Sequence, residues 1–175
     1  VFNKEFVPPK TDGSGNNRSN LLIAKKILEE EGWFINNNKL MKDGKEFKFE
    51  FLIISPSDEK IGLAFQKSLK TLGITMDVRT VDSSQYQARL LNYDFDMIKR
   101  YWGVSLSPGN EQQFYWGSDV GKKDGSRNYS GVDSPVVDAL IEKLISAKTR
   151  EELRTAIHAL DRVLLWGHYV IPLYH

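Results

Sequence analysis

Several features that would place the chain in a specialised class are missing from its 175 residues. It contains no cysteine, which excludes disulfide bonds and thiolate metal sites. No run of about 18 apolar residues occurs, so the sequence predicts no transmembrane helix. Charges of the two signs nearly cancel, with 24 Lys and Arg against 23 Asp and Glu, and no basic cluster is longer than a pair such as that at 122–123. A nucleic-acid partner is not expected, because such proteins carry a basic stripe.

Enzyme signatures are equally scarce. The sequence has no Gly-x-Ser-x-Gly elbow, no His-Glu-x-x-His motif and no phosphate-binding glycine loop. Residues 57–60 (Ser-Asp-Glu-Lys) match the Ser-x-x-Lys pattern of acyl-serine enzymes, but the partner motifs of that chemistry are absent. We interpret Ser57 as a helix cap, and we expect neither a catalytic residue nor a cofactor.

A few titratable side chains remain as candidates for chemistry. His158 and Asp161 lie three residues apart on a predicted helix, but a metal site needs three or four ligands and the sequence brings no others together. His168 follows Gly167 at a predicted helix end, where an imidazolium favours the helix dipole. A structural role is favoured for all three histidines, including His175, so no metal site is predicted. Asp94 and Asp96 share one face of a predicted strand. Paired carboxylates can act in acid–base catalysis, but surface charges that keep a sheet edge soluble are the commoner explanation.

Strand and helix patterns alternate along the first two thirds of the chain. This alternation predicts an α/β fold, with a mixed sheet built from βαβ units. We expect the strands to lie in one sheet, the first two parallel and joined by a right-handed helical crossover. After an irregular lead-in over 1–18, the predicted elements are a helix from Ser19 or Asn20 to Gly32, a strand over 47–54, a helix from Ser55 to Gly73, a strand over 74–81, a short helix after a capping box at 82–85, and a strand over 94–101.

The last part of the chain, 134–175, has the pattern of a helical hairpin. Ser134 and Pro135 begin one helix, and Thr149 to Glu152 form a capping box for the next. Between the strands and this hairpin, residues 101–133 combine six glycines with several Trp and Tyr residues. Long aromatic loops on an α/β scaffold are often functional, although a surface loop packed by its own aromatic residues has the same composition.

Several segments carry a resemblance to a known family. They are residues 102–111 (Trp-Gly-Val-Ser-Leu-Ser-Pro-Gly-Asn-Glu), 125–131 (Gly-Ser-Arg-Asn-Tyr-Ser-Gly), 134–141 (Ser-Pro-Val-Val-Asp-Ala-Leu-Ile), 159–164 and 169–173, with the helix at 20–33, Leu-Gly-Ile at 72–74 and Asp-Phe-Asp-Met at 94–97. In order and spacing they resemble family 5, the peptide- and nickel-type extracellular solute-binding proteins of ABC transporters. The Ser-Pro-Gly-Asn-Glu run resembles the branch for oligopeptide and peptide-antibiotic uptake.

The resemblance implies a substrate-capturing receptor that binds oligopeptides between two lobes and delivers them to ABC permease subunits in the periplasm or outside the cell. Family members are two-lobed and longer, so 1–175 is expected to be most of the second lobe of a type-2 periplasmic-binding-protein fold, with 19–133 as its α/β core and 134–175 as the hairpin. Val1 in place of Met fits that expectation. The first lobe of the same protein would be the missing partner.

The implied ligand-binding residues lie in the loops of 101–133. They are Tyr101, Trp102, Gly103, Val104, Ser105, Asn128 and Tyr129. We expect residues 101–108, with Asn128 and Tyr129, to line one open face. Exposed loop backbone can pair with a peptide, and aromatic side chains add apolar walls without demanding one sequence.

One residue departs from the family pattern. Many peptide binders of the family carry an Asp in this loop that pairs with the ligand's α-amino group, and the matching position here is Ser105. A serine has no charge to offer an ammonium group. The ligand class therefore stays open between a peptide and another solute, such as an oligosaccharide or a metal chelate, with a hydrolase as the alternative from another class.

Overall fold

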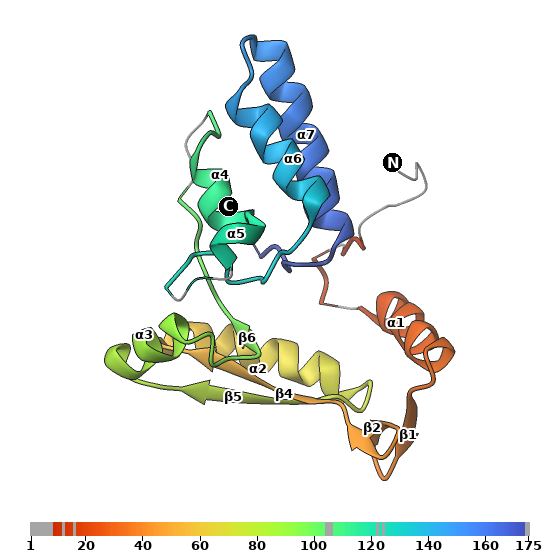
Figure 1. The fold of residues 1–175 in the computed structure, drawn as a ribbon. Helices are drawn as coiled ribbons and strands as arrows, with labels where there is room; N and C mark the ends of the chain where they lie inside the picture. Colours follow the sequence, from red (N-terminus) through yellow and green to blue (C-terminus); the bar gives the residue numbers. More distant parts are fainter. Residues whose placement is uncertain are drawn as a thin grey trace. The chain divides into compact units, whose positions relative to one another are not determined.

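The computed structural model of the chain describes residues 9–11, 13–15, 17–103, 107–121, 123 and 125–173. They divide into two compact units (Figure 1). The sheet unit comprises Pro9–Arg89 and Asp94–Arg100, and the helical unit comprises Leu90–Tyr93 and the chain from Tyr101 onward. The loop segment from 101 to 133, which the sequence analysis assigned to the α/β core, therefore clusters with the C-terminal hairpin.

The elements follow one another in the order drawn in Figure 1. Their bounds are α1 (Arg18–Glu30), β1 (Phe34–Asn36), β2 (Lys39–Lys42), β3 (Lys45–Glu46), β4 (Lys48–Ile53), α2 (Pro56–Lys70), β5 (Thr75–Thr80), α3 (Ser83–Leu91), β6 (Met97–Ile98), α4 (Glu111–Trp116), α5 (Ser118–Gly121), α6 (Pro135–Ile145) and α7 (Arg150–Trp166).

The main sheet has the strand order β5-β4-β6, and both pairings are parallel. The prediction that 47–54, 74–81 and 94–101 share one sheet is confirmed, as is the helical connection through α2 between the first two strands. The third strand is shorter than predicted, with only two residues. Before it, the Asp96 carboxylate accepts a hydrogen bond from the Glu50 backbone N–H at 2.8 Å, so a side chain replaces the backbone ladder there.

Helix α2 packs closely on this sheet because Gly62 has no side chain. A Cβ atom at Gly62 would lie 2.9 Å from the buried ring of Phe51 and 3.2 Å from Val78. The apolar face of β4 and β5 meets the helix here, with Phe51, Ile53 and Met76 forming its buried core.

Gly62→Ala should lower the free energy of unfolding by about 1 kcal/mol, because overpacking by about 1–3 kcal/mol outweighs a helix-propensity gain of about 1 kcal/mol. Urea denaturation monitored by circular dichroism measures the change. Ala64→Gly on the exposed side of α2 is the control and should cost about 1 kcal/mol from propensity alone. Stabilisation by Gly62→Ala would contradict the close packing.

A small antiparallel sheet of β1, β2 and β3 precedes the main sheet and was not predicted. Its two turns place residues in the left-handed region, with φ of 48° and 62° at Asn37 and Asn38, and 50° and 75° at Asp43 and Gly44. Two-residue turns of this kind favour Asn and Gly and match the twist of a hairpin. The backbone N–H of Leu40 donates to Gly73 O at 2.7 Å, which connects this hairpin to the end of α2.

The helical unit is organised around the α6–α7 hairpin, which confirms the prediction for 134–175. Thr149 and Glu152 form the expected capping box at the start of α7. The buried core of the hairpin consists of Val132, Val137, Ile141, Leu144, Ala156 and Leu160. Two short helices, α4 and α5, lie in the segment that was predicted to be loop.

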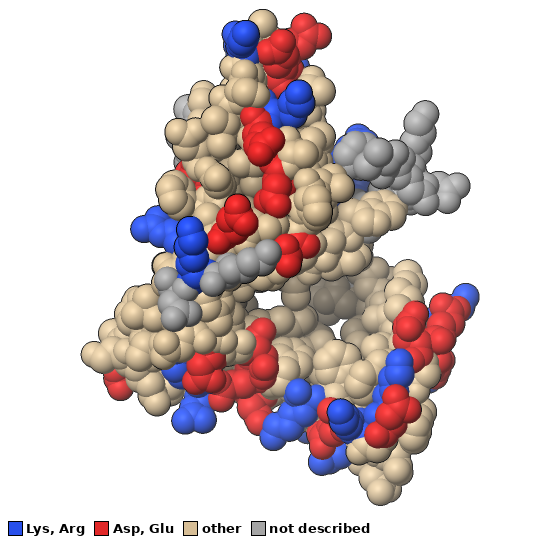
Figure 2. Space-filling model, viewed as in Figure 1, with Lys and Arg blue, Asp and Glu red and all other residues tan. Residues whose placement is uncertain are grey.

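The surface charge is mixed. On the face drawn in Figure 2, basic and acidic side chains are interspersed, and no single-sign field is visible there. This agrees with the near-zero net charge of the sequence. Among the described residues, no helix is both long enough and apolar enough to cross a membrane.

Candidate functional site

The loop that leaves β6 carries the first three predicted site residues. Tyr101 is 69% exposed, whereas Trp102 is half-buried. The Trp102 ring stacks on Trp116 of α4, with ring centroids 5.3 Å apart and planes inclined by 26°. Offset stacking of this kind orients both rings. Val104 and Ser105 lie outside the described residues.

Helix α4 fixes the backbone on both sides of this loop. The buried Tyr115 donates its hydroxyl hydrogen to Gly103 O at 3.0 Å. The Glu111 carboxylate accepts the Gly109 backbone N–H at 2.9 Å, and this bond lowers the pKa of Glu111 below its ordinary value. Trp116 donates its indole N–H to Gln112 at 3.2 Å. The helix is therefore the platform on which Trp102 and Gly103 are held.

Asn128 does not lie on an open face, and this part of the site prediction is wrong. Its side chain is 0% exposed. The amide nitrogen donates to Gly117 O at 3.1 Å and to Val132 O at 2.8 Å, and the amide oxygen accepts the Val132 N–H at 2.9 Å. The reason is that irregular backbone, once buried, needs hydrogen-bond partners, and one carboxamide supplies two donors and an acceptor.

Asp138 and Ser118 extend this set of side-chain bonds to the backbone. We call the side chains of Asn128, Asp138 and Ser118 the internal bracket. Asp138 in the first turn of α6 accepts the Ser118 backbone N–H at 2.9 Å. The Ser118 hydroxyl accepts the Ser134 N–H at 3.0 Å. The segments 125–131 and 134–141, which carried much of the family resemblance, therefore join the α4–α5 region to α6 as scaffold.

Tyr129 occupies an intermediate position. It is half-buried, and its ring centroid lies 6.3 Å from that of Tyr93. The Tyr93 hydroxyl is hydrogen-bonded to Ser126. Through α4 and the residue after it, the structure brings the two predicted loops onto one support: Trp102 and Gly103 contact α4, and Asn128 contacts Gly117. The sequence analysis did not single out Tyr115 and Trp116; they belong to the aromatic-rich stretch 101–133, and that stretch was the available signal.

Asp94 and Asp96 are engaged in structural contacts. Asp94 accepts from Arg89 Nε at 2.9 Å, and Asp96 is bonded to the β4 backbone. Among the described residues, no group of three His, Asp or Glu side chains is arranged to hold a metal. The prediction that Ser57 is a helix cap is wrong. The N-cap of α2 is Ser55, whose side chain accepts the Ser57 N–H at 3.2 Å.

The sheet unit contains a buried ion pair directly before the aromatic loop. Lys99 contacts the carboxylate of Asp58 in the first turn of α2, and their side chains are 9% and 13% exposed. Lys99 O also accepts the Tyr86 hydroxyl at 3.2 Å. These contacts fix the point from which the chain continues to Tyr101.

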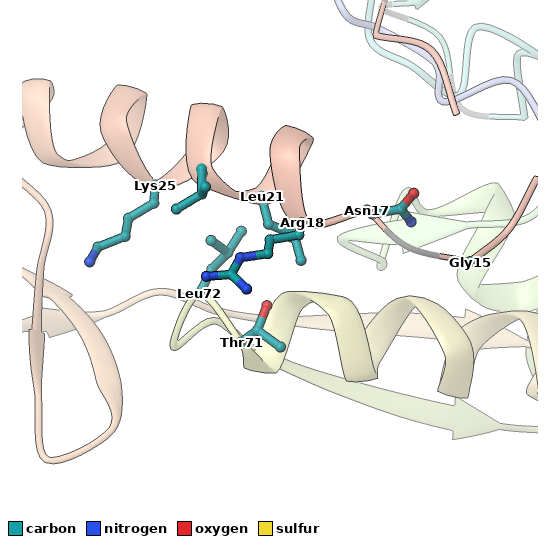
Figure 3. A pocket seen from close by; sticks show the side chains of 8 residues that line it. Gly15, Asn17, Arg18, Leu21, Lys25, Thr71 and Leu72 are labelled. Atoms are coloured by element: carbon teal, nitrogen blue, oxygen red, sulfur yellow. The ribbon is translucent and has the colours of Figure 1, made fainter. Parts of the chain in front are cut away.

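A hollow of about 360 Å³ lies between α1 and the end of α2 (Figure 3). Its lining includes the apolar side chains of Leu21 and Leu72 and the basic side chains of Arg18 and Lys25. All of its lining residues belong to the sheet unit, and none was predicted as a site residue.

Known proteins with similar sequences and structures fall into one group. Residues 2–124 match the family model described as bacterial extracellular solute-binding proteins, family 5, middle part. A putative binding protein of Brucella melitensis (BMEII0691) is 46% identical over 100% of this chain and 29% of its own length. A probable peptide-binding protein of Agrobacterium fabrum (YejA) is 40% identical over 100% of this chain and 29% of its own length.

Among solved structures, the chain is similar to the oligopeptide-binding protein AppA of Bacillus subtilis in complex with a nonapeptide. The TM-score is 0.75 and the sequence identity 26%, over 85% of this chain and 30% of AppA. The chain thus spans less than a third of the length of the curated relatives described above.

Proposed function

Because the chain belongs to family 5 of the bacterial extracellular solute-binding proteins, we propose that it is the second-lobe part of an ABC importer's receptor for oligopeptides. The fold and the family are those of binding proteins, not of enzymes. The receptor captures a peptide between two lobes and delivers it to permease subunits. In this proposal the receptor works in the periplasm or outside the cell and catalyses no reaction.

The observation that carries the proposal is the Trp102–Gly103 loop held on α4. Tyr101 is exposed beside it, and the stack on Trp116 and the Tyr115 bond orient its backbone. A preorganised loop loses little entropy on binding, and its aromatic rings contact a peptide without selecting one side chain. The peptide class is supported by the name of the Agrobacterium relative and by the nonapeptide bound to AppA.

The structure divides the predicted site residues into three groups. Tyr101, Trp102, Gly103 and Tyr129 remain proposed ligand contacts, because they lie on the loop or at the edge of the bracket. Val104 and Ser105 are proposed only from the family resemblance. Asn128 is removed from the proposal because it is fully buried.

In the complete protein, Trp102→Ala should weaken oligopeptide binding at least about tenfold, the range of a central aromatic contact. Isothermal calorimetry measures the change, with a peptide first identified by mass spectrometry of ligands that co-purify with the protein. Trp102→Phe retains a ring for the stack on Trp116 and should lose less affinity. Trp166→Ala, a half-exposed tryptophan on α7, is the control and should leave affinity unchanged.

Two outcomes would redirect this proposal. Unchanged affinity in Trp102→Ala, with the thermal midpoint preserved, would remove Trp102 from the site. Co-purification of an oligosaccharide or a metal chelate instead of peptides would keep the receptor role and replace the ligand class.

A further inference from the structure

Helix α1 carries apolar side chains on two sides. Its inner side, with Leu21, Ala24 and Leu28, packs on the cluster around Leu40 and Ile74. Its outer face, which we define as Ile23 and Ile27, is exposed by 60% and 54%. Ile23 and Ile27 lie four residues apart and therefore on one side of the helix, where they form an apolar stripe. Leu22, exposed by 59%, lies apart from this stripe, with Arg18 and Lys26 four residues away on either side. A helix that is apolar on both sides is typical of one buried on both sides.

The ends of α1 add little to its stability. Asn17 at the N-cap makes no side-chain capping bond, and the first turn contains no acidic residue. Arg18 stands at the start and Glu29 and Glu30 at the end, which opposes the helix dipole. The helix depends on tertiary packing, and in the described structure that packing covers only its inner side.

The next element along the chain is also apolar and uncovered. Strand β1 follows three residues after α1 and is an edge strand of its sheet, with Phe34 and Ile35 both exposed. Leu22 also lines the hollow between α1 and α2 (Figure 3). By contrast, Leu63 of α2, exposed by 48%, has Glu59, Lys60 and Lys67 along its helix, as an isolated surface leucine does.

We propose that the outer face of α1 is the docking surface for the remainder of the same polypeptide, that is, for the residues of the complete protein outside these 175. The inference rests on the proposed function, in which this chain is one part of a longer receptor. The relatives exceed the chain more than threefold in length, so ample polypeptide exists to cover the face. Burial of apolar surface against it supplies the packing that the helix ends lack.

The test compares one double variant, Ile23→Lys with Ile27→Lys, in two contexts. In the 175-residue chain the thermal midpoint should stay within about 1 °C, because both side chains face solvent. In the complete protein it should fall by about 5 °C, because two buried contacts are lost and two charges face an apolar surface. Amide protons of α1 should also exchange about 100-fold more slowly in the complete wild-type protein than in the 175-residue chain.

Leu63→Lys is the matched control and should leave the thermal midpoint unchanged in both the 175-residue chain and the complete protein. An equal loss in both contexts, or no loss in either, would overturn the proposal. A 175-residue chain that dimerises until the double variant is introduced would assign the face to a second copy. Peptide binding by the complete protein is measured in parallel. If the protein binds peptide but the double variant lowers the thermal midpoint equally in both contexts, only this inference is refuted. If the thermal midpoint falls only in the complete protein but no peptide binds, only the proposed peptide receptor is refuted.

Discussion

Asn128→Ala should lower the free energy of unfolding of the helical unit by about 3–5 kcal/mol, and we expect no larger stability effect from substitution at any other position of this unit. The variant leaves two carbonyls, of Gly117 and Val132, and the Val132 N–H without their partner. Each unsatisfied buried group costs about 1–3 kcal/mol, and the side chain is 0% exposed, so water does not reach its place without rearrangement.

Chemical denaturation monitored by tryptophan fluorescence measures this loss. Asn110→Ala is the matched control: Asn110 lies at the N-cap of α4, is exposed, and makes no side-chain capping bond. It should cost less than about 0.5 kcal/mol. Asn128→Asp retains the acceptor but buries a charge and loses both donors, so it should be at least as destabilising as Asn128→Ala. A cost below about 1 kcal/mol for Asn128→Ala would mean that the bracket is not what holds the loops.

The regular parts of the fold could be predicted because their patterns are long. Strand β4 alternates over six residues, and the capping box at Thr149 precedes a helix of 17 residues. The small sheet was missed because its strands have three, four and two residues, too few for periodicity to register. Its turns were the readable signal, because Asp43-Gly44 is a dipeptide typical of two-residue hairpin turns.

The candidate site could be predicted only in outline. The aromatic composition of 101–133 drew attention to Trp102, but a sequence does not indicate which aromatic partner stacks on it, because Trp116 lies 14 positions later. Asn128 between glycines is equally compatible with a turn, a ligand contact or an internal bracket. Burial decides among these roles, and burial depends on the distant Gly117 and Val132 backbone.

The 175-residue chain alone should bind oligopeptides no more tightly than about 1 mM, even if the complete protein binds them at about 1 μM. A two-lobed receptor contacts its ligand from both sides, whereas the proposed site on the Trp102 loop would contact it from one. With about half the contacts, a binding free energy of about −8 kcal/mol falls to about −4 kcal/mol, while the entropy lost on association is paid in full.

Calorimetric titration of the same peptide into the chain and into the complete protein tests this difference of about a thousandfold. The chain must be folded for the comparison to count, which the buried cores of both units favour and circular dichroism verifies. Adding the remaining polypeptide in trans should recover part of the affinity, since it restores the second contact surface. Micromolar binding by the chain alone would instead place every essential ligand contact within these residues. Tyr101, 69% exposed, would then have to be covered by the ligand itself rather than by a closing lobe.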